Sequence, residues 1–226
     1  MMTRVKICGV TRWDDLEAAV NFGASAVGLV LEPKSPRFVR QDNEMFKRKH
    51  HVPPFVTMVA VFQRVPKFLL PPQLSFFDVL QSEEGKLPVI VSVGGGPPKA
   101  HVRALRLDAE ATVDELLEIQ RVASAFLLDT FIPNWDHSSA PLNWEVAAEF
   151  VQACRLPVIL AGGLTPDTVG EAIRQVKPYA VDVCEGVESA PGLKDHGKLR
   201  AFMEAVRDAD NDLWRLSSSS ELPQAA

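Results

Sequence analysis

The chain has 226 residues, of which 46% are hydrophobic and 23% are charged, a balance typical of folded globular proteins rather than disordered or fibrous ones. A formal net charge of -5 and the lack of a long basic run argue against binding to a nucleic-acid backbone. No apolar run approaches the roughly 20 residues that span a bilayer, and the three cysteines have no C-x-x-C spacing. We therefore expect a cytoplasmic protein with no membrane role.

Short runs rich in β-branched residues alternate with helix-like segments along the chain. Such alternation predicts parallel strands joined by crossover helices. The runs are apolar almost throughout, as in a parallel sheet covered by helices, so the pattern favours a barrel or a doubly wound sheet. The predicted strands are residues 5–8, 26–31, 55–62, 76–80, 125–128, 158–161 and 180–183.

Helix signals lie between these runs. Thr11 is expected to cap a helix that includes residues 14–21, and Thr165, followed by Pro and Asp, is expected to open another. A last helix at about residues 197–209 completes the repeat. The polar, serine-rich end beyond it predicts a disordered tail over residues 211–226.

The middle of the chain is less regular than the rest. Residues 89–93 and 102–107 are both candidate strands, and the Gly-Gly-Gly-Pro-Pro run at 94–98 stops any helix there. We assign the fifth strand to residues 102–107, followed by a helix at 113–122. The prediction is a single α/β domain over residues 1–210, a (β/α)8 barrel whose fourth helix is irregular or missing.

Three reactive residues follow apolar runs directly. In a (β/α)8 barrel the chemistry lies at the carboxyl ends of the strands, and Cys8, Asp129 and Asp182 meet that condition. Each also has a structural interpretation, since a cysteine there is often a small core residue and an aspartate often caps the next helix. The residues around them are needed to choose.

Those surrounding residues resemble a known family. The matching blocks are KICG at 6–9 with Thr11, GLV at 28–30, SPRFV at 35–39, LLDT at 127–130, LAGGL at 160–164, VDV at 181–183, GVE at 186–188, Pro191-Gly192 and Lys194-Asp195. In order and spacing they resemble phosphoribosylanthranilate isomerase, a tryptophan-pathway family. The resemblance covers most of residues 3–207 except the middle.

The resemblance implies an Amadori rearrangement of N-(5-phosphoribosyl)anthranilate that needs no cofactor. Asp129 would be the general acid that opens the ribose ring, and Cys8 would be the general base that removes the C2′ proton. An acid of this kind needs a raised pKa, and a thiolate base needs a pKa below the usual value of about 8.5. Whether Lys6, on the same strand face as Cys8, activates the thiol is left open by the sequence.

The resemblance also assigns the binding residues. Arg37 would hold the anthranilate carboxylate, and Asp182 would face the substrate. The glycines of the two loops after the seventh and eighth strands, Gly162, Gly163 and Gly186, would hold the phosphate. The structural alternatives are a solvated loop arginine, an aspartate in a cap or buried ion pair, and glycines that serve tight turns.

Three departures mark the chain as a divergent member. Where the family has a glycine-rich segment after the catalytic aspartate, this chain has residues 137–144, with Ser138, Ser139 and Pro141 in place of the glycines. The family's Q-L-H-G block lacks its histidine here and gains two carboxylates at 83 and 84. Glu185 replaces a serine, and its side chain is expected either to face outward or to repel an anionic substrate.

Three hypotheses remain open at this point. The protein is an active isomerase, a same-fold paralogue with altered substrate or weakened activity, or a barrel that binds a ligand without catalysis. We expect a small phosphorylated substrate, no nucleic-acid or membrane partner, and a monomer or homodimer. No G-x-G-x-x-G follows a strand and the histidines lack metal-ligand spacing, so neither a nucleotide cofactor nor a metal is expected.

Overall fold

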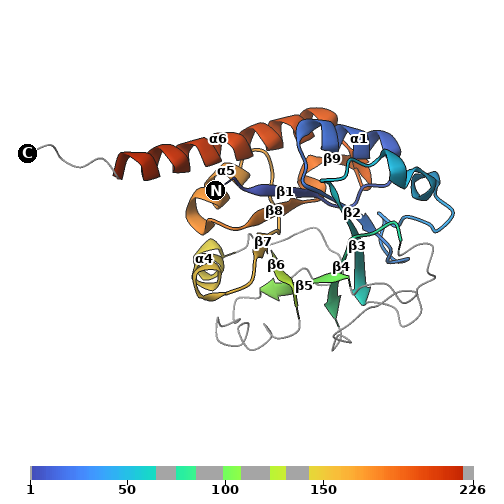
Figure 1. Ribbon diagram of the computed structural model, residues 1–226, viewed down its shortest axis with the longest axis horizontal. Helices are drawn as coiled ribbons and strands as arrows, with labels where there is room; N and C mark the ends of the chain where they lie inside the picture. The colour runs from blue at the N-terminus through green and yellow to red at the C-terminus, as the bar shows by residue number, and fades with distance from the viewer. Residues whose placement is uncertain (1, 65–74, 85–98, 108–122, 131–142, 221–226) are drawn as a thin grey trace, which may run out of the picture.

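The protein folds into a closed barrel of eight parallel strands in chain order, with β1 paired to both β2 and β8 (Figure 1). The prediction of a (β/α)8 barrel is therefore confirmed. The computed structural model describes residues 2–64, 75–84, 99–107, 123–130 and 143–220. The irregular or missing fourth helix, the alternative strand at 89–93 and the helix predicted at 113–122 fall outside these ranges.

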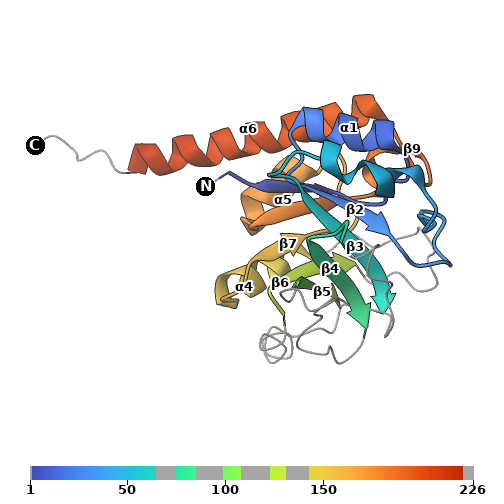
Figure 2. The same cartoon turned by 45° about the vertical axis from the view of Figure 1, so that its right-hand side comes forward.

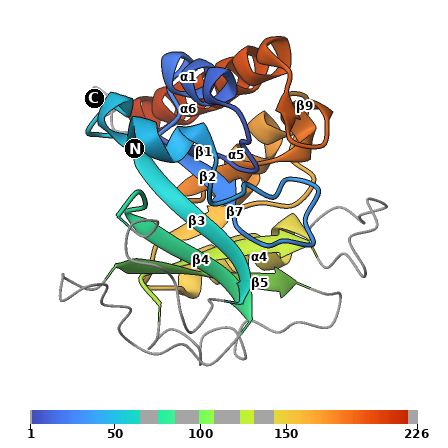
Figure 3. The same cartoon turned by 90° about the vertical axis from the view of Figure 1, so that its right-hand side faces the viewer.

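Seven of the eight strands fall on the runs predicted for them, and β4 overlaps its predicted run only at residues 79–80. The eight strands are β1 Arg4–Ile7, β2 Ala26–Val30, β3 Thr57–Arg64, β4 Val79–Glu84, β5 Ala100–Leu107, β6 Ala125–Thr130, β7 Val158–Leu160 and β8 Ala180–Val183. The assignment of the fifth strand to 102–107 is confirmed within β5. Figures 2 and 3 show β3, β4 and β5 side by side, as their pairing requires.

The fourth strand lies later in the chain than expected. Phe76 and Phe77 were assigned to it, but they are buried before β4 begins and lie against Phe46, with ring centroids 5.2 and 6.0 Å apart. The apolar character of these residues reflects this aromatic cluster rather than strand pairing. As a result Gln81 lies inside the strand and not in a loop after it.

Side chains along each strand alternate between two environments. Val5, Ile7 and Val181 belong to the core between the barrel and its helices, so Lys6 and Asp182 point into the barrel. A smaller apolar cluster fills the interior on the side of β5 to β8, from Val102, Ala104, Leu127, Ile159, Ala161 and Ala180. The inward charges of β1 and β8 therefore face a mostly apolar opposite wall.

The described helices cover the outside of the barrel. They are α1 Trp13–Phe22, α4 Trp144–Ala153, α5 Val169–Val176 and α6 His196–Ser220, with the short 3-10 helices η1 Glu44–His51 and η4 Glu185–Val187. A small hairpin, β9 Glu188–Ala190 and β10 Leu193–Lys194, follows η4. Figure 1 shows α6 lying across α1 and α5 on one side of the molecule.

Both predicted threonine caps are wrong. The helix α1 begins after Arg12, and the Thr11 hydroxyl instead donates to the Gly192 carbonyl at 2.6 Å. Thr165 opens a turn rather than a helix, since its carbonyl accepts from Thr168 and Val169, and α5 begins at Val169. The Thr11 hydroxyl is used in a long-range hydrogen bond, and Thr165 is used in a local turn, so neither residue caps the helix that follows it.

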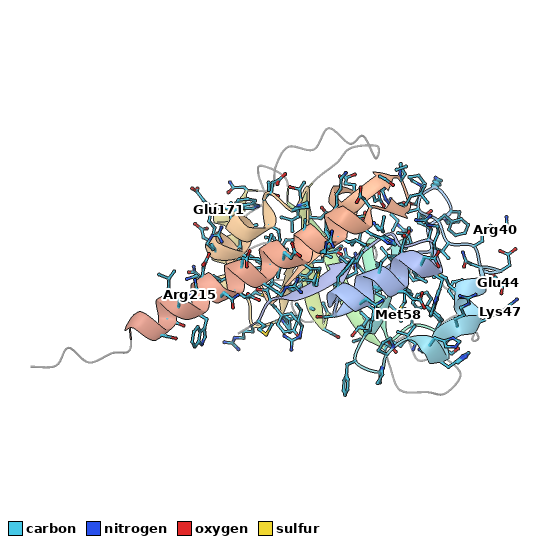
Figure 4. The ribbon with its side chains drawn as sticks, turned by 90° about the horizontal axis from the view of Figure 1, so that it is seen from above. Arg40, Glu44, Lys47, Met58, Glu171 and Arg215 are labelled. Atoms are coloured by element: carbon cyan, nitrogen blue, oxygen red, sulfur yellow. The ribbon has the colours of Figure 1, made fainter. Side chains whose placement is uncertain are left out.

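The carboxyl-terminal prediction is also wrong over residues 211–220. The last helix runs to Ser220 instead of ending near 209, and Figure 4 shows Arg215 on the part that projects beyond the barrel. Asp210 is tied to Thr3 by hydrogen bonds of 2.8 and 2.6 Å, whereas Trp214 is 68% exposed. Residues 221–226 lie outside the described ranges. Within the described ranges, no helix is both long and apolar enough to cross a membrane.

Because the projecting turns of α6 bury little surface, we expect a chain that stops after Leu213 to lose under about 1 kcal/mol of folding stability. Phe202, which lies on the same helix but is fully buried, is the matched comparison. Phe202→Ala should cost about 3 to 5 kcal/mol. Thermal unfolding of the two variants measures this difference, and a truncated chain that melts as early as Phe202→Ala would contradict it.

Candidate active site

A cavity lies at the carboxyl ends of the strands, where barrel enzymes place their chemistry. All seven residues that the sequence analysis put in the site line this cavity. The lining residues are Cys8, Val30, Glu32, Ser35, Arg37, Val61, Phe62, Gln63, Gln81, Glu83, Asp129, Ala161, Gly162, Gly163, Leu164, Asp182, Val183, Cys184, Glu185 and Gly186. The structure thus brings together residues of β6 and β8, residues that follow β1, β7 and β8, and a residue of the loop after β2.

Cys8 enters the cavity directly after β1. Its N–H donates to the Val183 carbonyl at 2.9 Å, which extends the β1–β8 pairing by one residue. A Cβ atom on Gly28 of the neighbouring strand would lie 3.0 Å from Cys8 Sγ and 3.1 Å from a Lys6 side-chain carbon. The glycine therefore leaves the space that the thiol and the lysine occupy together.

The surroundings favour the thiolate form of Cys8. The hydrogen bond from the Cys184 thiol is the main influence; together with the Lys6 ammonium it outweighs burial and lowers the pKa of Cys8 to about 7. The same hydrogen bond, together with burial, raises the pKa of Cys184 well above its usual value. Cys8 is thus the thiol of the pair that ionises first.

Lys6 forms a buried ion pair inside the barrel. Its Nζ lies 2.8 Å from Asp182 Oδ2, and the side chains are 5% and 8% exposed. Burial alone would lower the pKa of Lys6, but the charge of Asp182 outweighs it and raises that pKa. The question that the sequence left open is answered, because Lys6 points inward and acts on Cys8. Asp182 lines the cavity and also adopts its alternative role, a buried ion pair.

Arg37 is held by a network that the sequence did not predict. Its Nε donates to both oxygens of Glu188, at 3.0 and 3.1 Å, and its Nη2 donates to Oε2 at 2.7 Å. Lys194, which is fully buried, binds the same carboxylate at 2.8 Å. Despite its burial, the pKa of Glu188 is lowered by these two cations. Nη1 of Arg37 donates to no described residue, so one edge of the guanidinium faces the cavity.

Glu185 lines the cavity beside Arg37 and does not face away from it. Its Oε2 lies 3.7 Å from Arg37 Nη2, and its side chain is 37% exposed. It approaches the same guanidinium nitrogen that donates to Glu188. An anionic ligand on Arg37 would therefore meet a carboxylate already in place.

Glycine is required in the two loops for two different structural reasons. Gly162 and Gly163 have φ angles of 83° and 67°, a conformation that favours glycine, and their N–H groups donate to no described residue. A Cβ atom on Gly186 would lie 1.9 Å from the Leu164 carbonyl oxygen, so only glycine lets the two loops pack together. This close packing places two open backbone donors at the wall of the cavity.

The family model described as "PRAI: N-(5'phosphoribosyl)anthranilate (PRA) isomerase" matches residues 5–205. The chain belongs to this isomerase family. A relative from Dechloromonas aromatica with the name N-(5'-phosphoribosyl)anthranilate isomerase is 36% identical over 217 residues, which cover 94% of this chain and all of the relative. A relative of the same name from Pseudomonas fluorescens (strain SBW25) is 39% identical, with 91% and 96% covered.

Solved structures of the isomerase family are similar in fold. The phosphoribosyl anthranilate isomerase of Thermotoga maritima has a TM-score of 0.78 and 30% identity, and 92% of this chain and all of that chain are covered. A second structure, of the enzyme with reduced 1-(o-carboxyphenylamino)-1-deoxyribulose 5-phosphate, has a TM-score of 0.74 at 30% identity and the same coverage. The prediction of an isomerase of this family is confirmed.

Four residues of this isomerase site escaped the sequence analysis as functional residues: Cys184, Glu188, Lys194 and Gln81. The first three follow β8 within the block that carries the family resemblance, which was a usable signal. Their contacts with Cys8 and Arg37 depend on β1 and the loop after β2, far away in sequence. Among the described residues, no group of three or more His, Cys, Asp or Glu side chains is placed to hold a metal.

Of the segments that diverge from the family pattern, one lies outside the described residues and another lies in the cavity. Residues 137–142, in which the family's glycines are replaced, lie outside the described residues, although Asn143 caps α4 and Trp144 begins it. In the other segment Glu83 lines the cavity from β4. With Glu185, two carboxylates that the family pattern lacks therefore lie in the site.

Because its pKa lies near 7, we expect Cys8 to be the first thiol of this isomerase to react with iodoacetamide as pH rises, with half-maximal rate at about pH 7. Cys154 is the internal control, because partial burial raises its pKa. Peptide mass spectrometry over a pH series measures each rate. Equal pH profiles for Cys8 and Cys154 would contradict the assignment of the thiolate.

Proposed function

We propose that this protein catalyses the Amadori rearrangement of N-(5-phosphoribosyl)anthranilate to 1-(2-carboxyphenylamino)-1-deoxyribulose 5-phosphate, in tryptophan biosynthesis, without a cofactor. The observation that carries the proposal is the presence of Cys8 and Asp129 in one cavity of an isomerase-family barrel. A related solved structure contains a reduced form of that product. A thiol and a carboxyl group can serve as the base and the acid for the proton transfers of this reaction.

Asp129 is the proposed general acid. It follows the buried residues Phe126, Leu127 and Leu128 on β6 and points inward with Leu127, so its carboxyl group meets the cavity beside an apolar wall. In its protonated form it gives a proton to the ribose ring oxygen. The C1′–O bond then breaks, and the anilino nitrogen supplies the electron pair that forms the Schiff base.

Cys8 is the proposed general base. Its thiolate removes the proton from C2′, and the electron pair of that C–H bond moves toward the iminium nitrogen to give an enolamine. Tautomerisation of the enolamine gives the ketone. The Lys6 ammonium, which is paired with Asp182, favours the thiolate form of Cys8 before the proton transfer. A thiolate with a lower pKa is a weaker base, but a thiol with a pKa of about 7 is still basic enough to accept the proton.

Arg37 is the proposed site for the anthranilate carboxylate. Glu188 fixes Nε and Nη2 of the guanidinium, so the edge that includes Nη1 faces the cavity in a defined direction. At the opposite side of the substrate, the N–H groups of Gly162 and Gly163 would receive the phosphate, and Gly186 completes that wall. Asp182 contributes to binding through its ion pair with Lys6.

The expectations about location and assembly are part of the same proposal. We propose a cytoplasmic enzyme that works as a monomer or homodimer on a small phosphorylated substrate. The free state of all three cysteines supports a reducing compartment. Size-exclusion chromatography with light scattering distinguishes the two assemblies.

Cys8→Ala and Asp129→Asn should each lower kcat by about 10²- to 10⁴-fold, because each removes one proton-transfer group. The measurement is the fluorescence change as freshly formed phosphoribosylanthranilate is consumed. The reaction type would be wrong if the native protein were no faster than either variant.

Cys154→Ala is the matched control for the thiol substitution. Cys154 lies at the end of α4 and away from the cavity, so its loss should leave kcat unchanged. Circular dichroism of all three variants shows whether each one folds.

One observation favours a second candidate, a same-fold enzyme with weakened affinity for a carboxylate substrate. Glu185 Oε2 lies 3.7 Å from Arg37 Nη2 and adds a negative charge beside the guanidinium proposed to bind the substrate. The pair is partly exposed, so its effect is moderate. This candidate differs from the first in its substrate selectivity and not in its chemical step.

Glu185→Gln should lower KM for phosphoribosylanthranilate by about three- to tenfold with little change in kcat, because it removes a like charge beside the carboxylate site. The same substitution should have little effect on a substrate analogue that lacks the carboxylate. Steady-state kinetics with both compounds measures the difference. An unchanged KM would show that Glu185 does not oppose substrate binding.

A further inference from the structure

The cavity contains a second thiol that the proposed reaction does not use. Cys184 directly follows β8, as Cys8 directly follows β1, and the last residues of the two strands, Ile7 and Val183, are register partners. Both cysteines line the cavity, and each thiol shifts the pKa of the other. They form a dithiol, the Cys8–Cys184 pair, built across the strand pairing that closes the barrel.

The backbone spacing suits a covalent link between them. Adjacent strands lie about 4.8 Å apart, and the Cys8 N–H to Val183 carbonyl bond of 2.9 Å keeps this spacing past the end of β1. Disulfides need Cα atoms about 4.4 to 6.8 Å apart. Gly9 gives Cys184 its room, since a Cβ atom there would lie 2.7 Å from the Cys184 sulfur.

The charges around the pair favour a reactive thiolate on the Cys8 side. Lys6 acts on Cys8, while Asp182 opposes it. On the other side the buried Nζ of Lys194 and one oxygen of Glu188 each lie 3.9 Å from the Cys184 sulfur. A thiolate that lines a cavity, next to a second thiol, is the arrangement in which a sulfenic acid is converted to a disulfide.

We propose that the Cys8–Cys184 pair is a covalent modification site, at which a small hydroperoxide such as hydrogen peroxide converts the two thiols into an intramolecular disulfide. The Cys8 thiolate attacks one peroxide oxygen, so that an S–O bond forms, the O–O bond breaks and hydroxide leaves. Cys184 then attacks the Cys8 sulfur, the S–S bond forms, and the S–O oxygen leaves as water with the thiol proton. With hydrogen peroxide, two thiols and one peroxide give one disulfide and two waters in total.

This modification would switch off the proposed base, because a disulfide sulfur has no thiolate to accept the C2′ proton. It would also protect Cys8, since a disulfide is returned to thiols by a reducing dithiol whereas a sulfinic acid is not. The loss of activity rests on the proposed function of Cys8. Formation of the cross-link does not, so mass spectrometry and activity test the two claims separately.

The experiment treats the reduced full-length protein with a small molar excess of hydrogen peroxide, blocks the remaining thiols with N-ethylmaleimide, and maps the peptides by mass spectrometry. We expect a cross-linked peptide pair that contains Cys8 and Cys184, with Cys154 still alkylated. Reduction with dithiothreitol should then restore both thiols, and with them the isomerase activity. Sulfinic Cys8 beside alkylated Cys184, or a cross-link to Cys154, would overturn the proposal.

Two variants sharpen the result. In Cys184→Ser the second step is impossible, so Cys8 should proceed to the sulfinic acid and dithiothreitol should no longer restore it. Cys154→Ser should form the cross-link as the native protein does. Recovery of the Cys8 thiol in Cys184→Ser to the native extent would contradict the role given to Cys184, and the native peptide map decides the matter if that variant does not fold.

Discussion

The pairing of β1 with β8 is the constraint on which the rest of the site depends. It closes the barrel between segments 176 residues apart and buries the Lys6–Asp182 ion pair at 2.8 Å. Two charges are tolerated there because each neutralises the other, and loss of one partner would leave an unpaired buried charge. Two residues further along each strand direction, the same pairing sets Cys8 beside Cys184. The strand pairing that closes the barrel therefore also places Lys6 and Cys184 beside the Cys8 thiol.

Arg37, Glu188 and Lys194 form a second charge network beside the cavity. Glu188 is shared by Arg37 and Lys194, which fixes the guanidinium while leaving one of its edges toward the cavity. The carboxylate is thus neutralised by two cations and the arginine retains capacity for a further anion. Glu185 approaches the same guanidinium at 3.7 Å. The site combines the proposed proton-transfer pair with a proposed binding region in which Glu185 adds a negative charge.

Site residues could be predicted where their position in the sequence alone marked them, and not where their role depends on a contact with a distant residue. Cys8, Asp129 and Asp182 were found because they follow apolar strands, and the cavity includes all three. The caps at Thr11 and Thr165 failed, because a distant carbonyl and a local turn took their hydrogen bonds. The tail prediction failed because a polar sequence was taken as disorder, although helix α6 continues through it.

The sequence by itself determined the alternation of strands and helices, which left a barrel and a doubly wound sheet open, and the reactive residues at the strand ends. It did so because periodicity and strand-end position are local properties. Only the tertiary structure decided that Lys6 points inward to Cys8, that Cys184 meets the same thiol, and that Glu185 turns toward Arg37. Those contacts join residues from opposite ends of the chain, and their geometry exists only once β8 has closed against β1.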